Sequence, residues 1–217
     1  MTAHGDTPER IIARRAAQEL RPGDVVNLGV GIPMKVLDFV DPDDGIILHG
    51  ENGMLGIGTL GPEDAPDPDL TNAGSVPVAV LPGGSFFSLL ESGAMMRGGH
   101  LDKVLMGGFE VDSTGTLANW ILSQYDIKGG IGGAMDLAVG ARELIVLMRH
   151  TTTSGGPRLV RKCTLPPTAI GVVNRIITEL AVIDVTPRGF VLKELLGDAD
   201  FDTVLRKTDA PLEDGRT

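Results

Sequence analysis

The sequence predicts an α/β protein, a single domain in which helices flank a mixed, largely parallel open sheet. Apolar runs of strand length alternate with segments whose apolar residues recur at helical spacing. The 30 glycines and 14 prolines fall between these segments, where turns are expected. The chain has 217 residues and no shift of composition along its length, so one domain is expected over residues 8–207, with tails at 1–7 and 208–217.

The first elements carry clear local signals. Thr7 and Pro8 are typical of an N-cap and a first helical position, and the apolar spacing after them predicts a helix over residues 8–20. A Pro-Gly turn then leads into a short strand at 25–28. A second helix is expected after that strand, ending near Val40.

The following elements continue this alternation. A strand at 45–49 ends in a glycine-rich loop, and the acidic stretch 62–69 is too rich in proline to form a helix. Residues 150–167 are expected to be irregular, and the polar tail after Lys207 to be frayed. The remaining predicted elements are strands at 76–81, 103–106, 144–148, 181–185 and 189–192, an extended segment at 117–122, and helices at 85–96, 134–141 and 172–180.

Glu51 is the leading candidate for a functional residue. It follows the predicted strand at 45–49 and opens the glycine-rich loop. Ligands of open α/β sheets bind at the carboxyl ends of strands, and glycines let the backbone approach a ligand closely. Two chemical roles are open to a carboxylate there, general base and covalent nucleophile; the alternative is a loop acid that faces water.

A second candidate region is the glycine pair Gly132 and Gly133, which precedes a predicted helix. Backbone N–H groups at a helix start can hold an oxyanion or a phosphate, although tight packing of helix on strand would explain the same glycines. Asn27, at the end of its strand, is either a side-chain donor into the same crevice or a turn-capping residue. His49 and His100 flank glycine-rich loops and are weaker candidates for pocket lining.

Charge and composition exclude several functions. The net charge of −10 argues against nucleic acid or an anionic membrane as a partner, and no apolar run approaches the ~20 residues of a membrane span. The polar N-terminus lacks the apolar region of a secretory signal, and the single cysteine, Cys163, is typical of an apolar filler in a reducing compartment, so a cytoplasmic location is expected. The histidines and Cys163 show no metal-ligand spacing. The G-x-G-x-x-G run at 56–61 leads into proline instead of a helix and is not a dinucleotide fingerprint.

Seven segments, taken together and in order, carry a family likeness. The chain resembles the B (beta) subunit of the class I CoA-transferases, the 3-oxoacid CoA-transferase group, over about residues 8 to 207. The segments are Val26-Asn27-Leu28-Gly29-Val30-Gly31-Ile32-Pro33, Glu51-Asn52-Gly53-Met54-Leu55-Gly56, Asn72-Ala73-Gly74, Met96-Arg97-Gly98-Gly99-His100, Leu117-Ala118-Asn119-Trp120, Gly132-Gly133-Ala134-Met135-Asp136-Leu137 and Cys163-Thr164-Leu165-Pro166.

The resemblance implies a CoA-transferase-like fold and covalent catalysis. Glu51 matches the residue that attacks an acyl-CoA thioester and then carries CoA as a glutamyl-CoA thioester. Asn27 and the backbone N–H of Gly133 match the donors that support the tetrahedral intermediates. No metal and no permanently bound cofactor are implied, because coenzyme A is itself a substrate. The residues that match the family's CoA-binding segments are Gly29, Gly31, Asn52, Gly53 and Gly132.

The resemblance also implies a partner and a reaction. The family's A (alpha) subunit is an obligate partner, the assembly is usually (AB)₂, and the active site lies near the interface of the two chains. The predicted reaction moves CoA from succinyl-CoA to a 3-oxo acid, either acetoacetate or 3-oxoadipate, with acetate and butyrate left open as acceptors. Two alternatives remain: an acyl-CoA hydrolase on the same scaffold, and a non-catalytic subunit that binds acyl-CoA.

Some positions depart from the family pattern. Gly50 replaces a serine, Ser75 replaces a lysine and Gly93 replaces a phenylalanine, while the segment 122–130 differs from the usual I-P-G-K and is one residue longer. These changes put the acceptor acid in question more than the type of reaction. Arg97 is a candidate for structural or carboxylate pairing, and the structural role is preferred.

Overall fold

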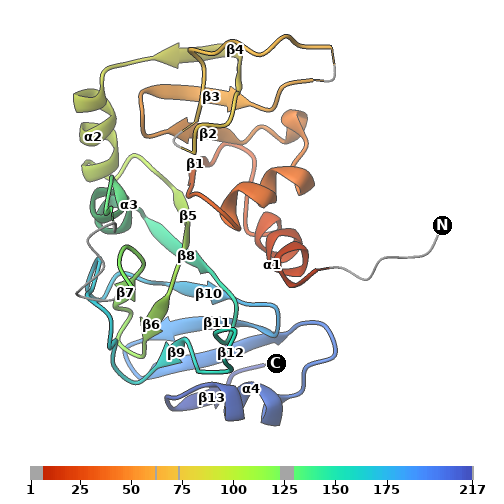
Figure 1. Ribbon diagram of the computed structural model, residues 1–217, viewed down its shortest axis with the longest axis vertical. Helices are drawn as coiled ribbons and strands as arrows, with labels where there is room; N and C mark the ends of the chain where they lie inside the picture. The colour runs from red at the N-terminus through yellow and green to blue at the C-terminus, as the bar shows by residue number, and fades with distance from the viewer. Residues whose placement is uncertain (1–6, 62, 73, 123–129, 217) are drawn as a thin grey trace, which may run out of the picture.

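The structure is a computed structural model that describes residues 7–61, 63–72, 74–122 and 130–216, and it confirms the α/β fold. Its main sheet has the strand order β13-β12-β11-β10-β8-β5-β1-β2-β3-β4 within these residues, and Figure 1 shows it running along the long axis of the molecule. The strands are β1 Val25–Leu28, β2 Ile47–Gly50, β3 Met54–Gly58, β4 Ala79–Phe86, β5 Lys103–Gly107, β8 Glu143–Leu147, β10 Arg175–Ile177, β11 Ala181–Thr186, β12 Gly189–Leu195 and β13 Leu212–Asp214.

The centre of the sheet is parallel. Strands β2, β1, β5, β8 and β10 are neighbours in this order, and each adjacent pair is parallel. Their side chains alternate between two buried layers: Val104 and Met106 belong to one hydrophobic cluster, and Leu105 between them belongs to the other. A strand covered on both faces needs apolar residues in succession, which explains why these strands were predicted as unbroken apolar runs.

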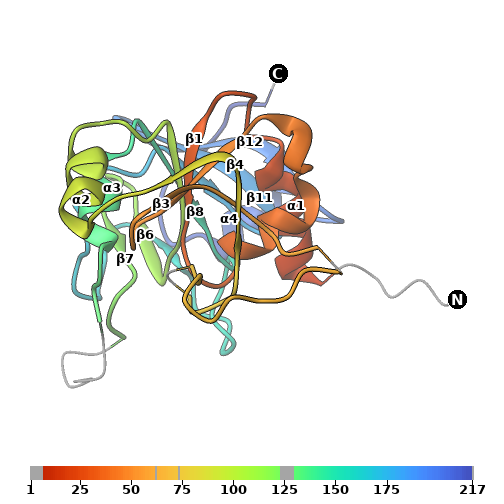
Figure 2. The same cartoon turned by 90° about the horizontal axis from the view of Figure 1, so that it is seen from above.

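Helices cover both faces of this parallel centre. Figure 2 shows α1 on one side of the sheet and α2 with α3 on the other. The Thr7 hydroxyl accepts a hydrogen bond from the amide of Arg10, which confirms the predicted N-cap of the first helix. Helix α1 packs on the 3₁₀ helix η1, and α2 packs on α3. The helices are α1 Pro8–Ala17, η1 Pro33–Phe39, η2 Pro42–Asp44, α2 Leu89–Arg97, α3 Ala134–Gly140 and α4 Phe201–Lys207.

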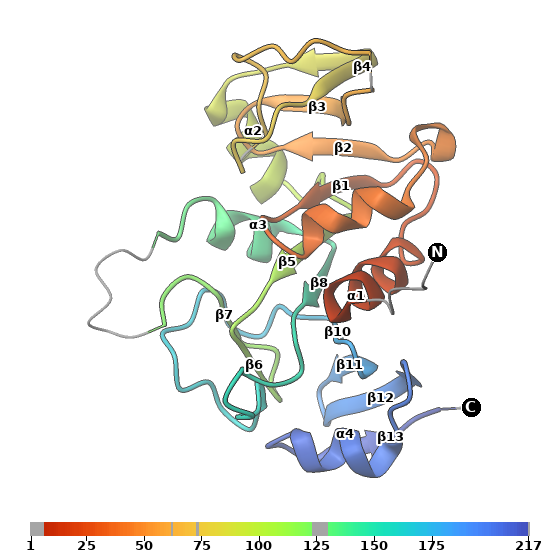
Figure 3. The ribbon, with the colours of Figure 1, turned by 45° about the vertical axis from the view of Figure 1, so that its right-hand side comes forward.

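Antiparallel strands extend the sheet beyond its parallel centre. Strands β3 and β4 continue it past β2, while β11 and β12 continue it past β10. Figure 3 shows α4 and β13 at the end opposite to β4. A second, small sheet has the order β7-β6-β9, with β6 Glu110–Asp112, β7 Leu117–Ala118 and β9 Leu159–Val160. None of the described helices combines the length and apolar character needed to cross a membrane.

The predicted helix at 172–180 is wrong. Residues 175–177 form β10, which pairs with β8 on one side and β11 on the other. Ile176 and Ile177 are both fully buried, one in each hydrophobic cluster. Short apolar runs do not distinguish a buried strand from a helix, and here the β-branched isoleucines follow the sheet.

Other differences concern boundaries and short elements. The segment expected to be frayed after Lys207 contains β13, which pairs in parallel with β12. Most of the glycine-rich loop after Glu51 is strand β3, and the helix expected from residue 85 begins at Leu89 because β4 extends to Phe86. Strands β6 and β9 and helix α4 were not predicted.

Candidate active site

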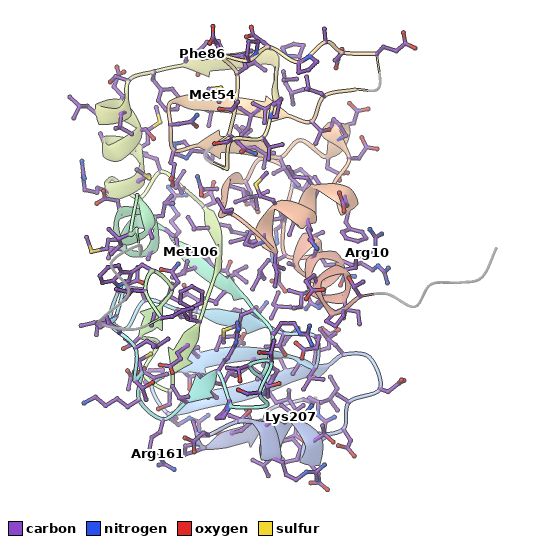
Figure 4. The ribbon with its side chains drawn as sticks, in the orientation of Figure 1. Arg10, Met54, Phe86, Met106, Arg161 and Lys207 are labelled. Carbon is purple, nitrogen blue, oxygen red and sulfur yellow. The ribbon has the colours of Figure 1, made fainter. Side chains whose placement is uncertain are left out.

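A cavity of about 420 Å³ opens at the carboxyl ends of the parallel strands β2, β1, β5 and β8. This is the edge of the sheet at which α/β proteins bind ligands. Met106, labelled in Figure 4, lines the cavity from the end of β5. The other residues of these strand ends that line it are Asn27, Leu28, Gly29, His49, Gly50, Glu51, Gly107, Gly108, Leu147 and Met148.

Glu51 follows the last residue of β2 and lines the cavity, as its sequence position predicted. Its side chain is partly buried, and burial raises its pKa above the usual value. The carboxylate lies against Gly133, the N-cap of α3, where an added Cβ atom would be 3.1 Å from Glu51 Oε2. A side chain at Gly133 would need the carboxylate to shift, and the structure brings together two predicted site residues that are far apart in the sequence.

Asn27 is 3% exposed and belongs to β1, where it is paired with His49 of the neighbouring strand β2. Its Nδ2 donates to the His49 carbonyl oxygen at 3.0 Å and lies 3.2 Å from His49 Nδ1. These two contacts fix the amide at the cavity wall. They also occupy Nδ2, so donation to a bound substrate requires the exchange of one of them.

His49 continues this chain of polar contacts away from the cavity. Its Nε2 lies 3.2 Å from the Ser92 hydroxyl, and its ring stacks on Phe87 at 5.9 Å between centroids. Burial lowers the pKa of His49 to about 4, so the ring is neutral at pH 7. A neutral ring that accepts from Asn27 at Nδ1 carries its hydrogen on Nε2 and donates to Ser92.

The turn after Glu51 depends on close backbone contacts. Gly53 has φ +121°, and any side chain there would overlap the carbonyl oxygen of Phe87. Asn52 Nδ2 donates to the Thr71 carbonyl oxygen at 2.7 Å. A Cβ atom at Gly50 would be 2.9 Å from Asn52 Oδ1, so the serine that the family commonly has there would displace this amide.

The predicted site residues divide into two groups. Asn27, Gly29, Glu51, Gly132 and Gly133 line the cavity. The other predicted residues shape the surrounding turns and do not line it; they are Gly31, Asn52 and Gly53.

Three further cavity residues were not predicted as site residues. Asn119 is held by the Gly107 carbonyl oxygen and the Thr168 hydroxyl, and Trp120 donates from Nε1 to the Pro167 carbonyl oxygen. Both belong to a segment of the family likeness, which was the only available signal. Arg158 lies in a region expected to be irregular, where nothing in the sequence marks it.

Other candidates lie elsewhere. His100 is exposed and does not line the cavity. Arg97 pairs with Asp136 at 3.1 Å, a contact between α2 and α3 of the structural kind that was preferred for it. Cys163 donates from Sγ to the Thr116 carbonyl oxygen, and burial raises its pKa to about 12, as expected for an unreactive thiol.

Besides Gly50, two departures from the family pattern are visible in the structure. Ser75 has φ +61°, a left-handed conformation rare for residues other than glycine. Gly93 lies inside α2, where a Cβ atom would meet the far end of the Arg97 side chain at 2.9 Å. The altered segment lies for its greater part, residues 123–129, outside the described residues.

The cavity has few ionisable groups. Among the described residues that line it, these are Glu51, His49 and Arg158. No group of three or more His, Cys, Asp or Glu side chains in the described ranges is placed to hold a metal ion. The arrangement is therefore a partly desolvated carboxylate beside the backbone of a helix start, which suits covalent attack on a carbonyl carbon.

Comparisons with known proteins agree with this arrangement. The Coenzyme A transferase family model matches residues 10–205. The chain is 45% identical to the B subunit of the 3-oxoadipate CoA-transferase of Pseudomonas putida, covering 93% of this chain and 94% of that protein. It is 45% identical to the B subunit of the succinyl-CoA:3-ketoacid coenzyme A transferase of Helicobacter pylori (93% and 97% covered). It is 44% identical to the beta subunit of the acetate CoA-transferase of Escherichia coli K12 (96% and 94% covered).

A solved structure shares the fold. The acyl-CoA transferase YdiF of Escherichia coli O157:H7, solved as the apoenzyme, matches with a TM-score of 0.77 at 22% identity. The match covers 100% of this chain and 43% of the YdiF chain, so the present chain corresponds to less than half of that protein.

Proposed function

The chain belongs to the coenzyme A transferase family, and we propose that it is the B subunit of an enzyme that moves CoA from succinyl-CoA to a 3-oxo acid. The proposed acceptors are 3-oxoadipate, which is in the name of one relative, and acetoacetate, which is a 3-keto acid of the class in the name of another. One observation carries the proposal: the Glu51 carboxylate is partly buried in the cavity and lies against Gly133.

In the proposed mechanism, the Glu51 carboxylate adds to the thioester carbonyl carbon, and cleavage of the C–S bond gives an acyl–glutamyl anhydride and CoA thiolate. The thiolate attacks the glutamyl carbonyl carbon of the anhydride, which forms glutamyl-CoA and releases the donor acid as its carboxylate. The acceptor carboxylate then attacks glutamyl-CoA, and the same two steps run in reverse. New acyl-CoA and free Glu51 result, and no proton or electron is gained or lost.

The surroundings of Glu51 support this role. Burial raises the pKa of the carboxyl, so the ionised form is poorly hydrated and less stabilised than in water, which makes it a better nucleophile. The backbone at Gly133 and the amide of Asn27 are the proposed donors to the tetrahedral oxyanions. Asn27 takes this role when its Nδ2 exchanges one contact with His49 for the substrate oxygen.

The surface beside α2 and α3 supports a partner chain, the proposed A subunit. Apolar side chains are exposed on both helices and on the end of β4, and the two helices pack against each other. An exposed apolar surface of this kind is typical of a protein interface. We propose that the A subunit covers it in an (AB)₂ assembly in the cytoplasm, with coenzyme A as a substrate and no resident cofactor. The exposed residues are Phe86, Leu89, Leu90, Met135 and Val139.

The test is to trap the intermediate. The chain, co-expressed with its A subunit, is incubated with succinyl-CoA or acetoacetyl-CoA without an acceptor, treated with hydroxylamine or borohydride, and mapped by mass spectrometry. Modification of Glu51 is expected. The Glu51→Ala variant should not be modified, whereas Glu63→Ala, which removes an exposed acid, should be modified as the wild type is.

Other outcomes separate the alternatives. An unmodified Glu51 in a complex that binds CoA and does not turn it over would indicate a non-catalytic subunit. Steady release of free CoA without an acceptor would indicate a hydrolase. Either result would contradict the proposed transfer reaction.

A further inference from the structure

Arg158 is a cation at the wall of the cavity that pairs with none of the described carboxylates. It is the only Lys or Arg among the described residues that line this space. Its Nη1 donates to the Gly108 carbonyl oxygen at a long 3.4 Å, and its Nε is buried without a hydrogen-bond partner. A guanidinium has five N–H donors, and the contact with Gly108 uses one of them.

Three other partly buried arginines form ion pairs. Arg149 also has a buried Nε without a hydrogen-bond partner, but it pairs with Glu9 at 3.2 Å and with Glu179 at 3.6 Å. Arg15 contacts Glu19 and Glu194, and Arg175 contacts Glu19 and Asp184, at 2.6 to 2.7 Å. The described carboxylates form no such pair with Arg158. Burial and the like charge of Arg149 lower the pKa of Arg158, while the charge of Glu179 acts in the opposite direction.

Glu179, the carboxylate whose charge acts on Arg158, already has other partners. Glu179 pairs with Arg149 at 3.6 Å and accepts a hydrogen bond from the amide of His150 at 2.9 Å. Arg158 is partly buried, and a charge removed in part from water without an ion-pair partner carries a free-energy penalty that a bound anion would reduce. The Arg158 guanidinium is therefore suited to binding an anionic ligand in the cavity.

The position of Arg158 relative to Glu51 limits the size of that ligand. The contact with Gly108 places the guanidinium at the end of β5, and Glu51 follows the end of β2. Only β1 lies between these two strands, so their backbones are about 10 Å apart at a strand spacing of about 4.8 Å. Both residues line the same cavity, so a short carbon chain with a carboxylate at each end is a ligand of suitable size.

We propose that Arg158 binds the distal carboxylate of a dicarboxylic substrate, while the carboxyl or thioester group at the other end meets Glu51. This inference rests on the proposed transfer reaction and deepens it: the dicarboxylic partner, succinate or a 3-oxo dicarboxylic acid, is recognised by this chain. A planar guanidinium binds a carboxylate through two parallel hydrogen bonds. A monocarboxylic acid whose carboxylate is at Glu51 has no second carboxylate to form them.

The test compares two acids of equal length as CoA acceptors. The complex with the A subunit is supplied with acetoacetyl-CoA and either succinate or butyrate, and kcat/KM is measured for each. Arg158→Gln is expected to lower kcat/KM about 100-fold for succinate and less than about 3-fold for butyrate. Arg158→Lys, which keeps the charge and loses the planar fork, should lower the succinate value about 10-fold.

Arg161→Gln is the matched control. This arginine lies in the same segment, is exposed, and is labelled in Figure 4 away from the cavity. Its removal should change neither acid's kcat/KM by more than about 2-fold, because an exposed surface charge contributes little. An equal loss for succinate and butyrate in Arg158→Gln would overturn the proposal, and so would no loss at all.

Equilibrium binding separates this proposal from the transfer reaction itself. Succinate and butyrate are titrated into the wild-type complex and into Arg158→Gln by calorimetry, without turnover. A preference for succinate that disappears in the variant supports Arg158 even if the wild-type complex transfers no CoA. Equal binding of succinate by both proteins would rule out the role of Arg158 whatever the activity.

Discussion

His49 and His150 are both buried, at 2% and 0% exposure, and burial lowers the pKa of each to about 4. Both nitrogens of each ring have a hydrogen-bonding partner. His150 lies between the hydroxyls of Thr178 and Thr208, each at 3.0 Å, and does not line the cavity. His49 lies between Asn27 and Ser92 and lines the cavity next to Glu51.

The comparison shows that a perturbed pKa does not by itself mark a functional histidine. The same burial acts on both rings, and the same neutral state results. What differs is the partner. Thr208 is the C-cap of α4, so His150 joins a helix end to the sheet. Asn27 lines the cavity, so the position of His49 affects a residue of the cavity wall. The four predictions below separate the two regions.

The largest expected effect is at Glu51, beside His49. Glu51→Gln keeps the shape and removes the nucleophile, so kcat should fall by about 10⁴-fold or more. Folding holds the proton of Glu51 more tightly than the unfolded chain does, because the folded pKa is raised. The ionised wild type is thus destabilised above that pKa, and Glu51→Gln should melt at a higher temperature at pH 7, with the difference lost as the pH falls. Activity within 10-fold of wild type would refute the assignment.

The second prediction compares the replacement of His49 with the replacement of His150. His49→Ala removes the acceptor that orients Asn27, so kcat should fall about 100-fold with little change in KM, as for a misplaced oxyanion donor. His49→Gln, which offers an amide oxygen to Asn27, should recover part of this loss. His150→Ala should leave kcat within about 3-fold and lower the free energy of unfolding by about 2 to 3 kcal/mol. If both alanine variants lowered the free energy of unfolding and left kcat unchanged, His49 would have no role in the reaction, contrary to this prediction.

The third prediction concerns acid pH, where the two histidines should act alike. Both are neutral in the folded protein down to pH 4 and are protonated near 6.5 when unfolded, so each contributes stability above 6.5 that is lost as the pH falls toward 4. The full contribution of each is about 3 kcal/mol, taking 1.36 kcal/mol per pKa unit. Urea unfolding at several pH values between 4.5 and 7 should show a shallower pH dependence in His150→Gln than in the wild type. An unchanged slope would contradict the low pKa.

The smallest effects are expected from the hydroxyl partners. Ser92→Ala removes the partner of His49 Nε2, and Thr208→Val removes the partner of His150 Nε2. Each should lower the free energy of unfolding by about 1 to 2 kcal/mol, because a buried polar atom is left without a hydrogen bond. Only Ser92→Ala should also lower kcat, by a few-fold. Equal kcat values in the two variants would mean that the position of His49 does not matter to the reaction.

The place of Glu51 at the cavity could be predicted from the sequence, whereas that of Arg158 could not, and the reasons are physical. Glu51 follows an apolar run, and its place at a strand end is a local property of the chain. Arg158 reaches the cavity only because the segment after β8 folds back beside His150 and β5, a contact set by the tertiary structure. The same limit explains β10, whose three residues become a strand because β8 and β11 lie on either side of it.

The order of strands in the sheet has a consequence for how the chain is made. Strand β5 lies between β1 and β8, so β1 keeps an open edge until residues 103–107 have been synthesised. Such an edge pairs readily with another chain, and parallel pairing across a long connection is slow. The nascent chain therefore passes through a stage at which association between copies competes with folding.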